Sequence, residues 1–227
     1  MITLAPADYT AIGLSIKIAV TAVGISLPFG FAVAYLVTFT RFRGKVLLEA
    51  VVNLPLTLPP VVIGYLLLLL LGRNGWLGRL LDGLGIRIIF TWKAAVIACA
   101  VVGFPLMVRA IRIGMEAIDL RLIQASRTLG APWYDTLASV ILPLSRRGVI
   151  AGSSLMFARS LGEFGATIIV AGNIPGVTQT IPLAIYDYVA SPGGEPMAAA
   201  LCLVSITISL AVLILHERLS RRDRGVA

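Results

Sequence analysis

The sequence predicts an all-α, polytopic membrane protein with five transmembrane helices, formed as a single domain over residues 1–227. Its residues are 58% hydrophobic and only 13% charged, and the mean hydropathy is +0.95. Such a chain has too few polar residues to cover a soluble domain. Several apolar runs reach the roughly 20 residues that a helix needs to cross the hydrocarbon core of a bilayer. The basic residues lie mostly between these runs, where they act as topology signals.

The five expected spans are separated by connections of which the loop between the third and the fourth is the longest. They cover residues of about 11–40, 46–72, 93–116, 146–171 and 196–217. The second span is interrupted because proline cannot continue the ladder of backbone hydrogen bonds, and its prolines are Pro55, Pro59 and Pro60. The segment IPLAIYDYVA could add a partial helix. A full sixth span is rejected because it would place the basic C-terminus outside.

The distribution of Lys and Arg predicts that the N-terminus faces outward and the C-terminus faces the cytoplasm, because cytoplasmic loops carry an excess of basic residues. With this orientation, thirteen basic residues lie in cytoplasmic segments, namely Arg41, Arg43, Lys45, Arg109, Arg112, Arg121, Arg127, Arg146, Arg147, Arg218, Arg221, Arg222 and Arg224. Four lie outside, namely Arg73, Arg79, Arg87 and Lys93, while Lys17 and Arg159 fall within spans.

The formal net charge of +8 also raises the question of nucleic acid binding. The basic residues do not form one patch with interleaved aromatic residues, so we expect membrane lipid, and no nucleic acid, as a partner. Cys99 and Cys202 lie within apolar runs, without a nearby His or a suitably spaced partner. We therefore expect them to pack in the core, and we expect no disulfide, no metal site and no catalytic residue.

The loop over about residues 117–145 is predicted to be cytoplasmic and to contain one short helix. Asp119 is a suitable N-cap, residues 120–129 favour a helix, Gly130 suits the left-handed position after its end, and Pro132 prevents its continuation. Apolar and polar residues segregate on this helix, as in a helix that docks into a groove on another protein. The alternative is a helix folded back against the spans of its own chain.

The spacing in this loop resembles the EAA loop of ABC importer permeases, whose pattern is Glu-Ala-Ala, three residues, Gly, nine residues and Ile-x-Leu-Pro. Gln replaces Glu, Ser replaces the second Ala and Val replaces Ile, whereas Gly and Leu-Pro match at the right separations. The resemblance assigns the family's ATPase-coupling role to Gln124, Ala125, Ser126, Gly130, Val140, Leu142 and Pro143. The segments LPLTLPPVVIGYLLLLLLGRNGWLG and FARSLGEFGATI extend the resemblance, specifically to molybdate permeases, over roughly residues 12–217.

This resemblance implies a type I ABC importer permease fold in the bacterial inner membrane. It also implies a homodimer, two cytoplasmic ATPase subunits that bind ATP and Mg, and a periplasmic binding protein that delivers molybdate or tungstate. The chain itself would bind no cofactor, because its one Gly-Lys pair, Gly44-Lys45, lacks the residues of a nucleotide-binding loop. A sulfate or thiosulfate permease is the alternative within the class. An ion-coupled secondary anion carrier is the alternative outside it, although acidic groups suited to ion coupling are few.

Arg159 and Glu163 lie four residues apart in the fourth span, so they share one helix face and are expected to pair. One interpretation places this pair beside the anion pathway, where Ser160 and Thr167 would add hydroxyl donors. The alternative is a structural ion pair near the cytoplasmic end, which fastens the fourth span to the third span or to a second subunit.

Pro59, Pro60 and Pro105 are candidate hinges for alternating access, because each frees a backbone carbonyl within a span. Static kinks that only shape the bundle are the alternative. Gly148 and Gly152 form a small-residue motif for close helix contact, either within one subunit or at a dimer seam.

The segment GNIPGVTQTIP, residues 172–182, is a candidate external gate or landing surface for a binding protein. Its polar groups, including Gln179, are expected to face outward. An ordinary exposed loop is the alternative.

Overall fold

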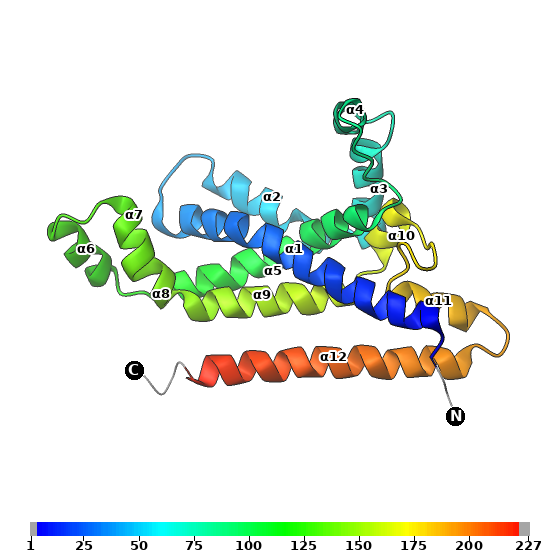
Figure 1. Ribbon diagram of the computed structural model, residues 1–227. Helices are drawn as coiled ribbons and strands as arrows, with labels where there is room; N and C mark the ends of the chain where they lie inside the picture. The colour runs from blue at the N-terminus through cyan, green and yellow to red at the C-terminus, as the bar shows by residue number, and fades with distance from the viewer. Residues whose placement is uncertain (1–3, 223–227) are drawn as a thin grey trace.

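The computed structural model describes the backbone of residues 4–222 and the side chains of residues 4–218. All regular secondary structure in this part of the chain is helical (Figure 1). The helices are α1 (Pro6–Phe39), α2 (Lys45–Thr57), α3 (Pro60–Leu71), α4 (Trp76–Gly83), α5 (Trp92–Glu116), α6 (Leu120–Thr128), α7 (Trp133–Thr136), the π-helix η1 (Leu137–Ile141), α8 (Leu142–Leu144), α9 (Arg146–Leu161), α10 (Gly165–Ala171), α11 (Ile181–Ala190) and α12 (Glu195–Arg222).

Three helices among the described residues, α1, α5 and α12, are long and apolar enough to cross a membrane. Two further apolar segments are broken helices. α2 and α3 meet at 114°, and α9 and α10 meet at 66°. The number of candidate spans is therefore up to five if each bent pair is one span. Arg221, Arg222 and Arg224, which contribute to the predicted orientation, lie outside the described side chains.

Helix α5 is the centre of the bundle, because it packs against α1 on one side and α9 on another. Small residues permit the close approach to α9. A Cβ atom on Gly148 would lie 2.8 Å from the carbonyl oxygen of Ala110, and one on Gly152 would lie 2.8 Å from that of Met107. The glycine pair therefore serves packing within one chain.

The predicted prolines act differently in the two spans that contain them. Pro59 precedes α3 in an extended conformation and Pro60 is its first residue, a position where the missing N–H costs no intrahelical hydrogen bond. The chain accordingly breaks at these two residues. Pro105 is buried inside α5, which continues through it without a break. The chain therefore bends at Pro59 and Pro60, whereas Pro105 lies in a continuous helix, and the hinge role of all three stays a prediction.

Helix α11 occupies one end of the bundle, opposite the end that carries α6 and α7 (Figure 1). It confirms the partial helix expected from IPLAIYDYVA. Two hydrogen bonds hold it to the start of α1: the backbone N–H of Ile181 donates to Ser15 Oγ at 2.9 Å, and the Tyr188 hydroxyl donates to Asp8 Oδ1 at 3.0 Å. Helix α12 then returns along the bundle and packs against α9 and α11.

Candidate functional site

The short helix α6 has a capping residue before its first turn and a glycine in the turn after its end. At its start, the backbone N–H of Arg121 donates to Asp119 Oδ1 at 2.9 Å, so a side chain satisfies one of the free N–H groups of the first turn. After its end, Gly130 adopts φ +88°, a conformation that side chains with a Cβ rarely adopt. The backbone N–H of Ala131 then donates to the carbonyl of Ser126 at 3.2 Å. Both predicted ends of the helix are confirmed.

Helix α6 stands away from the bundle at one end of the molecule (Figure 1). None of its nine residues is buried, and Leu129, which follows its last turn, is 89% exposed. A link to its own loop fixes its position, since Ser126 Oγ lies 3.0 Å from the hydroxyl of buried Thr136 on α7. Ile123 is partly buried against the hydrophobic core, so one face of the helix rests on its own chain, while most of its other side chains are exposed and accessible for docking.

The seven residues of the predicted coupling motif lie in consecutive parts of one loop. Three are on α6, Gly130 is in the turn, Val140 is in η1, and Leu142 and Pro143 are in α8. The π-helix has a local cause. Pro143 cannot donate a backbone hydrogen bond, and its ring would collide with the carbonyl four residues earlier in a regular α-helix. The turn is widened before it, and the N–H of Leu142 donates to the carbonyl of Leu137.

The predicted pair of Arg159 and Glu163 is confirmed and lies at the break between α9 and α10. Glu163 is buried, and its Oε2 lies 2.8 Å from Arg159 Nη2 in an ion pair without good hydrogen-bond geometry. Its Oε1 accepts a hydrogen bond at 2.8 Å from the backbone N–H of Ala166, so the same carboxylate caps α10. An anion at a helix N-terminus is stabilised by the exposed N–H groups and the helix dipole.

The pair lies at the end of α9 that is remote from the loop over residues 117–145. Thirteen residues of α9, 146–158, precede Arg159, which corresponds to roughly 20 Å at 1.5 Å per residue. The pair therefore lies at the break between α9 and α10 and not at the end of α9 beside that loop.

Unsatisfied polar atoms surround this pair. Ser160 Oγ and Thr167 Oγ1 are buried and have no hydrogen-bond partner among the described residues. Buried hydroxyls normally have a partner, so each such atom requires an explanation. The thiol of Cys99 on α5 donates to the backbone carbonyl of Ser160 at 3.6 Å. The four predicted pathway residues thus lie around one helix break, where Arg159, Ser160 and Thr167 can donate hydrogen bonds to a polar ligand or to water.

The two broken spans meet at their breaks. A Cβ atom on Gly165, the first residue of α10, would lie 3.1 Å from Cβ of Pro60. Further along, α3 and α10 pack against each other, and both also contact α5, against which α2 and α9 pack as well. The two helices that follow the breaks, α3 and α10, therefore form a contacting pair that is also attached to α5.

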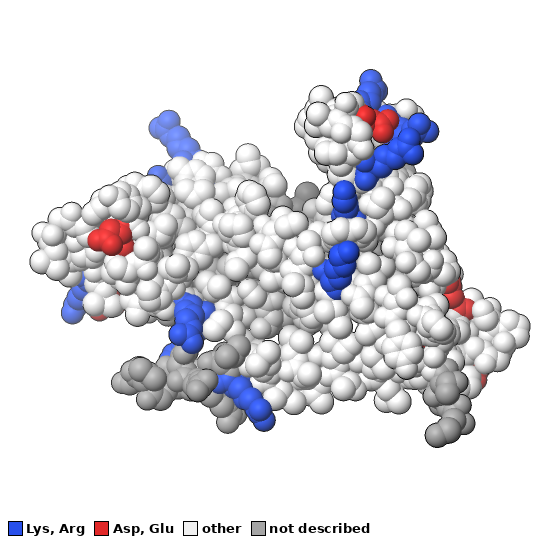
Figure 2. All heavy atoms as spheres, viewed as in Figure 1, with Lys and Arg blue, Asp and Glu red and all other residues white. Residues whose placement is uncertain are grey.

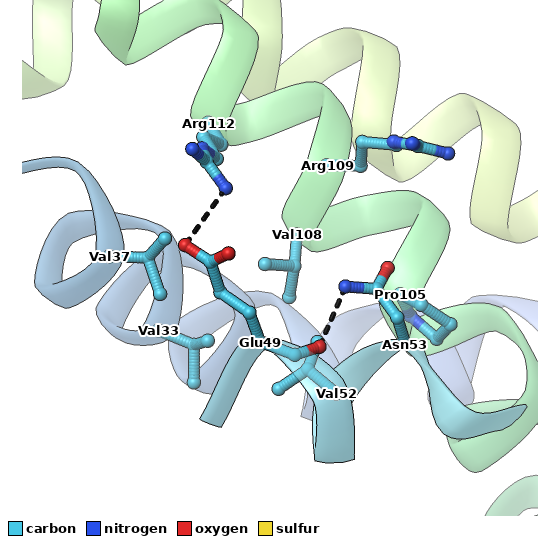
Figure 3. Close-up of a pocket in the computed structure, with 9 residues that line it drawn as sticks. All are labelled: Val33, Val37, Glu49, Val52, Asn53, Pro105, Val108, Arg109 and Arg112. Carbon is cyan, nitrogen blue, oxygen red and sulfur yellow. Dashed lines mark hydrogen bonds and ion pairs between the residues drawn. The ribbon is translucent and has the colours of Figure 1, made fainter. Parts of the chain in front are cut away.

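A cavity of about 220 Å³ lies between α1, α2 and α5 (Figure 3). At its wall, Arg112 Nη1 lies 3.1 Å from Glu49 Oε1, and Arg112 Nε lies 2.6 Å from Glu116 Oε1. Asn53 Nδ2 donates to the backbone carbonyl of Glu49 at 2.7 Å, whereas the side chain of Arg109 points away from Glu49. The ion pair therefore ties α2 to α5.

Sequence reasoning did not find this contact. In the sequence, Arg112 serves only as a topology signal. The spacing of Arg112 and Glu116 is visible in the sequence as a pair of residues on one helix face. The contact with Glu49, 63 residues away, has no local signal.

The segment over residues 172–182 differs from its prediction in the exposure of one side chain. Gln179 is only 8% exposed, and its Nε2 donates to Asp187 Oδ2 at 2.7 Å. Asn173 Nδ2 donates to the other carboxylate oxygen at 2.7 Å. The prediction that Gln179 faces outward is therefore wrong, because its amide anchors the segment to α11. Ile174 and Val177 are the exposed large side chains of this segment.

Comparisons with known proteins agree with this architecture. The family described as binding-protein-dependent transport system inner membrane component matches residues 26–225. The molybdenum transport system permease protein ModB of Escherichia coli (strain K12) is 51% identical over 218 residues, which cover 96% of this chain and 95% of the relative. ModB of Haemophilus influenzae is 52% identical, over 95% and 94% of the two chains. The sulfate transport system permease protein CysW of Synechococcus elongatus is 38% identical, over 94% and 76%.

Two solved structures share the fold at low sequence identity. The MetNI methionine ABC transporter in inward-facing conformations has a TM-score of 0.74 and 16% identity, over 93% of this chain and 94% of its own. A bacterial alginate ABC transporter in complex with a pentasaccharide-bound periplasmic protein has a TM-score of 0.75 and 14% identity, over 96% and 80%. The family match and the full-length relatives lead to one conclusion: this chain belongs to the family of binding-protein-dependent transport system inner membrane components.

Proposed function

We propose that this chain is the permease subunit of an ATP-driven importer that carries molybdate, with tungstate as a related cargo, into the cytoplasm. The observation that carries the proposal is 51–52% identity over nearly the whole chain to permeases named for molybdenum transport. The chain performs no bond chemistry in this proposal. ATP and Mg are bound by a separate ATPase subunit.

The proposed assembly contains two copies of this chain, two ATPase subunits and a periplasmic molybdate-binding protein. Each copy crosses the membrane five times, with the N-terminus outside and the C-terminus inside. The excess of basic residues in the loops assigned to the cytoplasm supports this orientation. The two bent helix pairs supply the second and fourth spans.

The proposed contact with the ATPase is α6 together with the following turn. Its support is physical: the helix is capped at Asp119, fixed at Ser126 and exposed at Leu129. A rigid helix at the tip of a loop can transmit a displacement because it moves as one body. The seven motif residues have this coupling role in the proposal.

The proposed gate is the place where the two broken spans meet. Closure of the ATPases would displace α9 through the loop that precedes it, and the bend at Pro59 and Pro60 would let α3 and α10 follow as a pair. The buried donors at Ser160 and Thr167 would then face the passing oxyanion beside Arg159. Weak binding at this point suits a transporter, because the pathway must release its cargo.

A sulfate-type oxyanion permease is the second candidate function. The observation in its favour is the 38% identity to a sulfate permease over 94% of this chain. Sulfate and molybdate are both tetrahedral dianions, so the permease alone discriminates weakly between them.

Competition for uptake tests the cargo. The chain is reconstituted into liposomes with its ATPase and binding protein, and uptake of labelled molybdate is measured with increasing unlabelled sulfate or tungstate. Tungstate is expected to compete at concentrations similar to molybdate, and sulfate only in large excess. Equal competition by sulfate would favour the second candidate.

A further inference from the structure

The segment between α3 and α5, residues 72–91, forms a lobe that projects from the bundle and contains α4 (Figure 1). A cavity of about 500 Å³ lies in this lobe, which is within the range of about 300–1,000 Å³ typical of small-molecule sites. We propose that this cavity binds an anionic phospholipid, whose phosphate contacts Arg73 and Arg87 and whose acyl chain covers the apolar wall. The proposal depends on the protein's residence in the membrane and is independent of its cargo.

The charge of the cavity favours an anionic headgroup. Arg73 and Arg87 both line it, and neither guanidinium has an ion pair or a hydrogen bond with the described residues. Asp82 also lines the cavity and is the only acidic residue of the lobe, which has three arginines in total. The lobe therefore carries a net positive charge. Figure 2 shows the basic side chains of the lobe gathered beside an acidic one. Two guanidinium groups are well suited to a phosphate, to which each can donate two hydrogen bonds.

The remaining wall of the cavity is apolar. Leu68 and Leu71 come from the end of α3, and Ile86, Ile88 and Ile89 come from the segment that precedes α5. A free inorganic anion gains nothing from such a wall, because its hydration shell would be lost without replacement. An amphiphile with a charged head and a hydrocarbon tail satisfies both parts of the site.

The position of the cavity in the chain also fits a lipid. It lies where the apolar helix α3 ends and just before the apolar helix α5 begins, so it is at the border of two hydrocarbon-spanning segments. Trp76 and Leu80 lie one turn apart on α4 and are 67% and 60% exposed. Trp is enriched at the interface between hydrocarbon and headgroups, and an amphipathic helix with Arg on its polar side binds that interface.

Phe90 is an unusual part of the cavity wall. Its backbone has φ +60°, although bulky residues rarely adopt positive φ, and the residue is 56% exposed. Its N–H donates to the carbonyl of Val170 on α10 at 2.9 Å, which holds this conformation in place. Strained residues that the surrounding structure retains are concentrated at functional sites. A lipid in the cavity would cover the exposed ring.

Native mass spectrometry of the full-length chain in detergent tests the site. Wild-type protein is titrated with phosphatidylglycerol and, in parallel, with zwitterionic phosphatidylcholine. The double variant R73Q/R87Q is expected to bind phosphatidylglycerol about tenfold more weakly, the equivalent of about 1.4 kcal/mol. R79Q is the matched control, since Arg79 belongs to the same lobe but donates to the backbone carbonyl of Asn74 and does not line the cavity. This control is expected to bind phosphatidylglycerol as the wild type does.

Two further measurements keep the test decisive. Thermal unfolding without added lipid is compared for all three proteins, and phosphatidylglycerol is expected to raise the midpoint of the wild type and R79Q more than that of R73Q/R87Q. Competition with inorganic phosphate is expected to leave bound phosphatidylglycerol in place, because phosphate cannot use the apolar wall. Equal affinity of R73Q/R87Q and wild type for phosphatidylglycerol would overturn the proposal. Displacement by inorganic phosphate would also overturn it, and would indicate a simple anion site.

Discussion

Gly64 of α3 and Ala166 of α10 are in backbone contact: a Cβ atom on Gly64 would lie 2.8 Å from the carbonyl oxygen of Ala166. The two residues belong to different broken helix pairs, each just beyond its bend. Both helices are short, and a break separates α3 from α2 and α10 from α9. The contact between Gly64 and Ala166 therefore joins two segments that can move as one unit.

The first prediction concerns this contact. Gly64→Ala is expected to lower the thermal stability of the permease and the rate of uptake, because a methyl group there forces the backbones apart. The expected cost is about 1–3 kcal/mol, as for overpacking of a tight interior contact. Gly24→Ala on α1 is the matched control, since a Cβ on Gly24 meets nothing within 4 Å. Equal effects of the two substitutions in thermal unfolding would contradict the proposed α3–α10 unit.

The second prediction concerns the turn after α6. Gly130→Val is expected to reduce the amount of cargo imported per ATP hydrolysed, because a β-branched residue strains the backbone at φ +88° and misdirects the loop. Gly130→Asn is the control, since Asn tolerates the left-handed conformation far better. Uptake and hydrolysis are measured in the same proteoliposomes. Normal coupling in Gly130→Val would count against docking through this turn.

The third prediction concerns the pair at the second break. Glu163→Gln keeps an oxygen that can accept the hydrogen bond from Ala166 N–H, but it removes the charge that pairs with Arg159. Arg159→Gln is expected to destabilise the protein, because Glu163, whose side chain is 1% exposed, is left as an unpaired buried charge. Glu163→Gln is expected to cost less, because the side chain of Arg159 is 32% exposed and can contact water. The double variant R159Q/E163Q is expected to lose less stability than the sum of the losses in the two single variants. Additive effects in thermal unfolding would exclude a coupled pair.

The fourth prediction concerns Tyr188 on α11. Burial, and then the hydrogen bond to Asp8, raise the pKa of Tyr188 above its ordinary value of 10.0. The protonated hydroxyl therefore contributes stability that is complete below pH 10 and is lost as the pH rises through the raised pKa. We expect Tyr188→Phe to be less stable than wild type at pH 8, by about 1 kcal/mol. As the pH rises above 10 the difference is expected to shrink, and it disappears only above the raised pKa of Tyr188, as measured by thermal unfolding. A difference that stays constant to high pH would argue that the hydroxyl is not the group responsible.

The structural features that could be predicted from the sequence are those that depend on nearby residues. The ends of α6 follow from Asp119 and Gly130, and the break before α3 follows from Pro59 and Pro60, since both effects act within a few residues. The angle of 114° between α2 and α3 could not be predicted from the sequence, because it depends on the packing of α3 on α10.

Other features depend on long-range contacts that no local pattern encodes. The break between α9 and α10 contains no proline; glycines flank it, and a carboxylate caps the second helix. Pro105 looked equivalent to Pro59 in the sequence, yet the packing of α5 on both neighbours keeps its helix continuous. The contacts of Arg112 with Glu49, and of Gln179 with Asp187, likewise depend on the final arrangement of helices.

The energy source of transport is the central claim, and one measurement tests it most directly. Labelled molybdate uptake is recorded in proteoliposomes that contain this chain and the binding protein, with or without the ATPase and ATP. We predict accumulation only when both the ATPase and ATP are present. Accumulation driven by an imposed ion gradient without nucleotide would contradict the account and identify the chain as a secondary carrier.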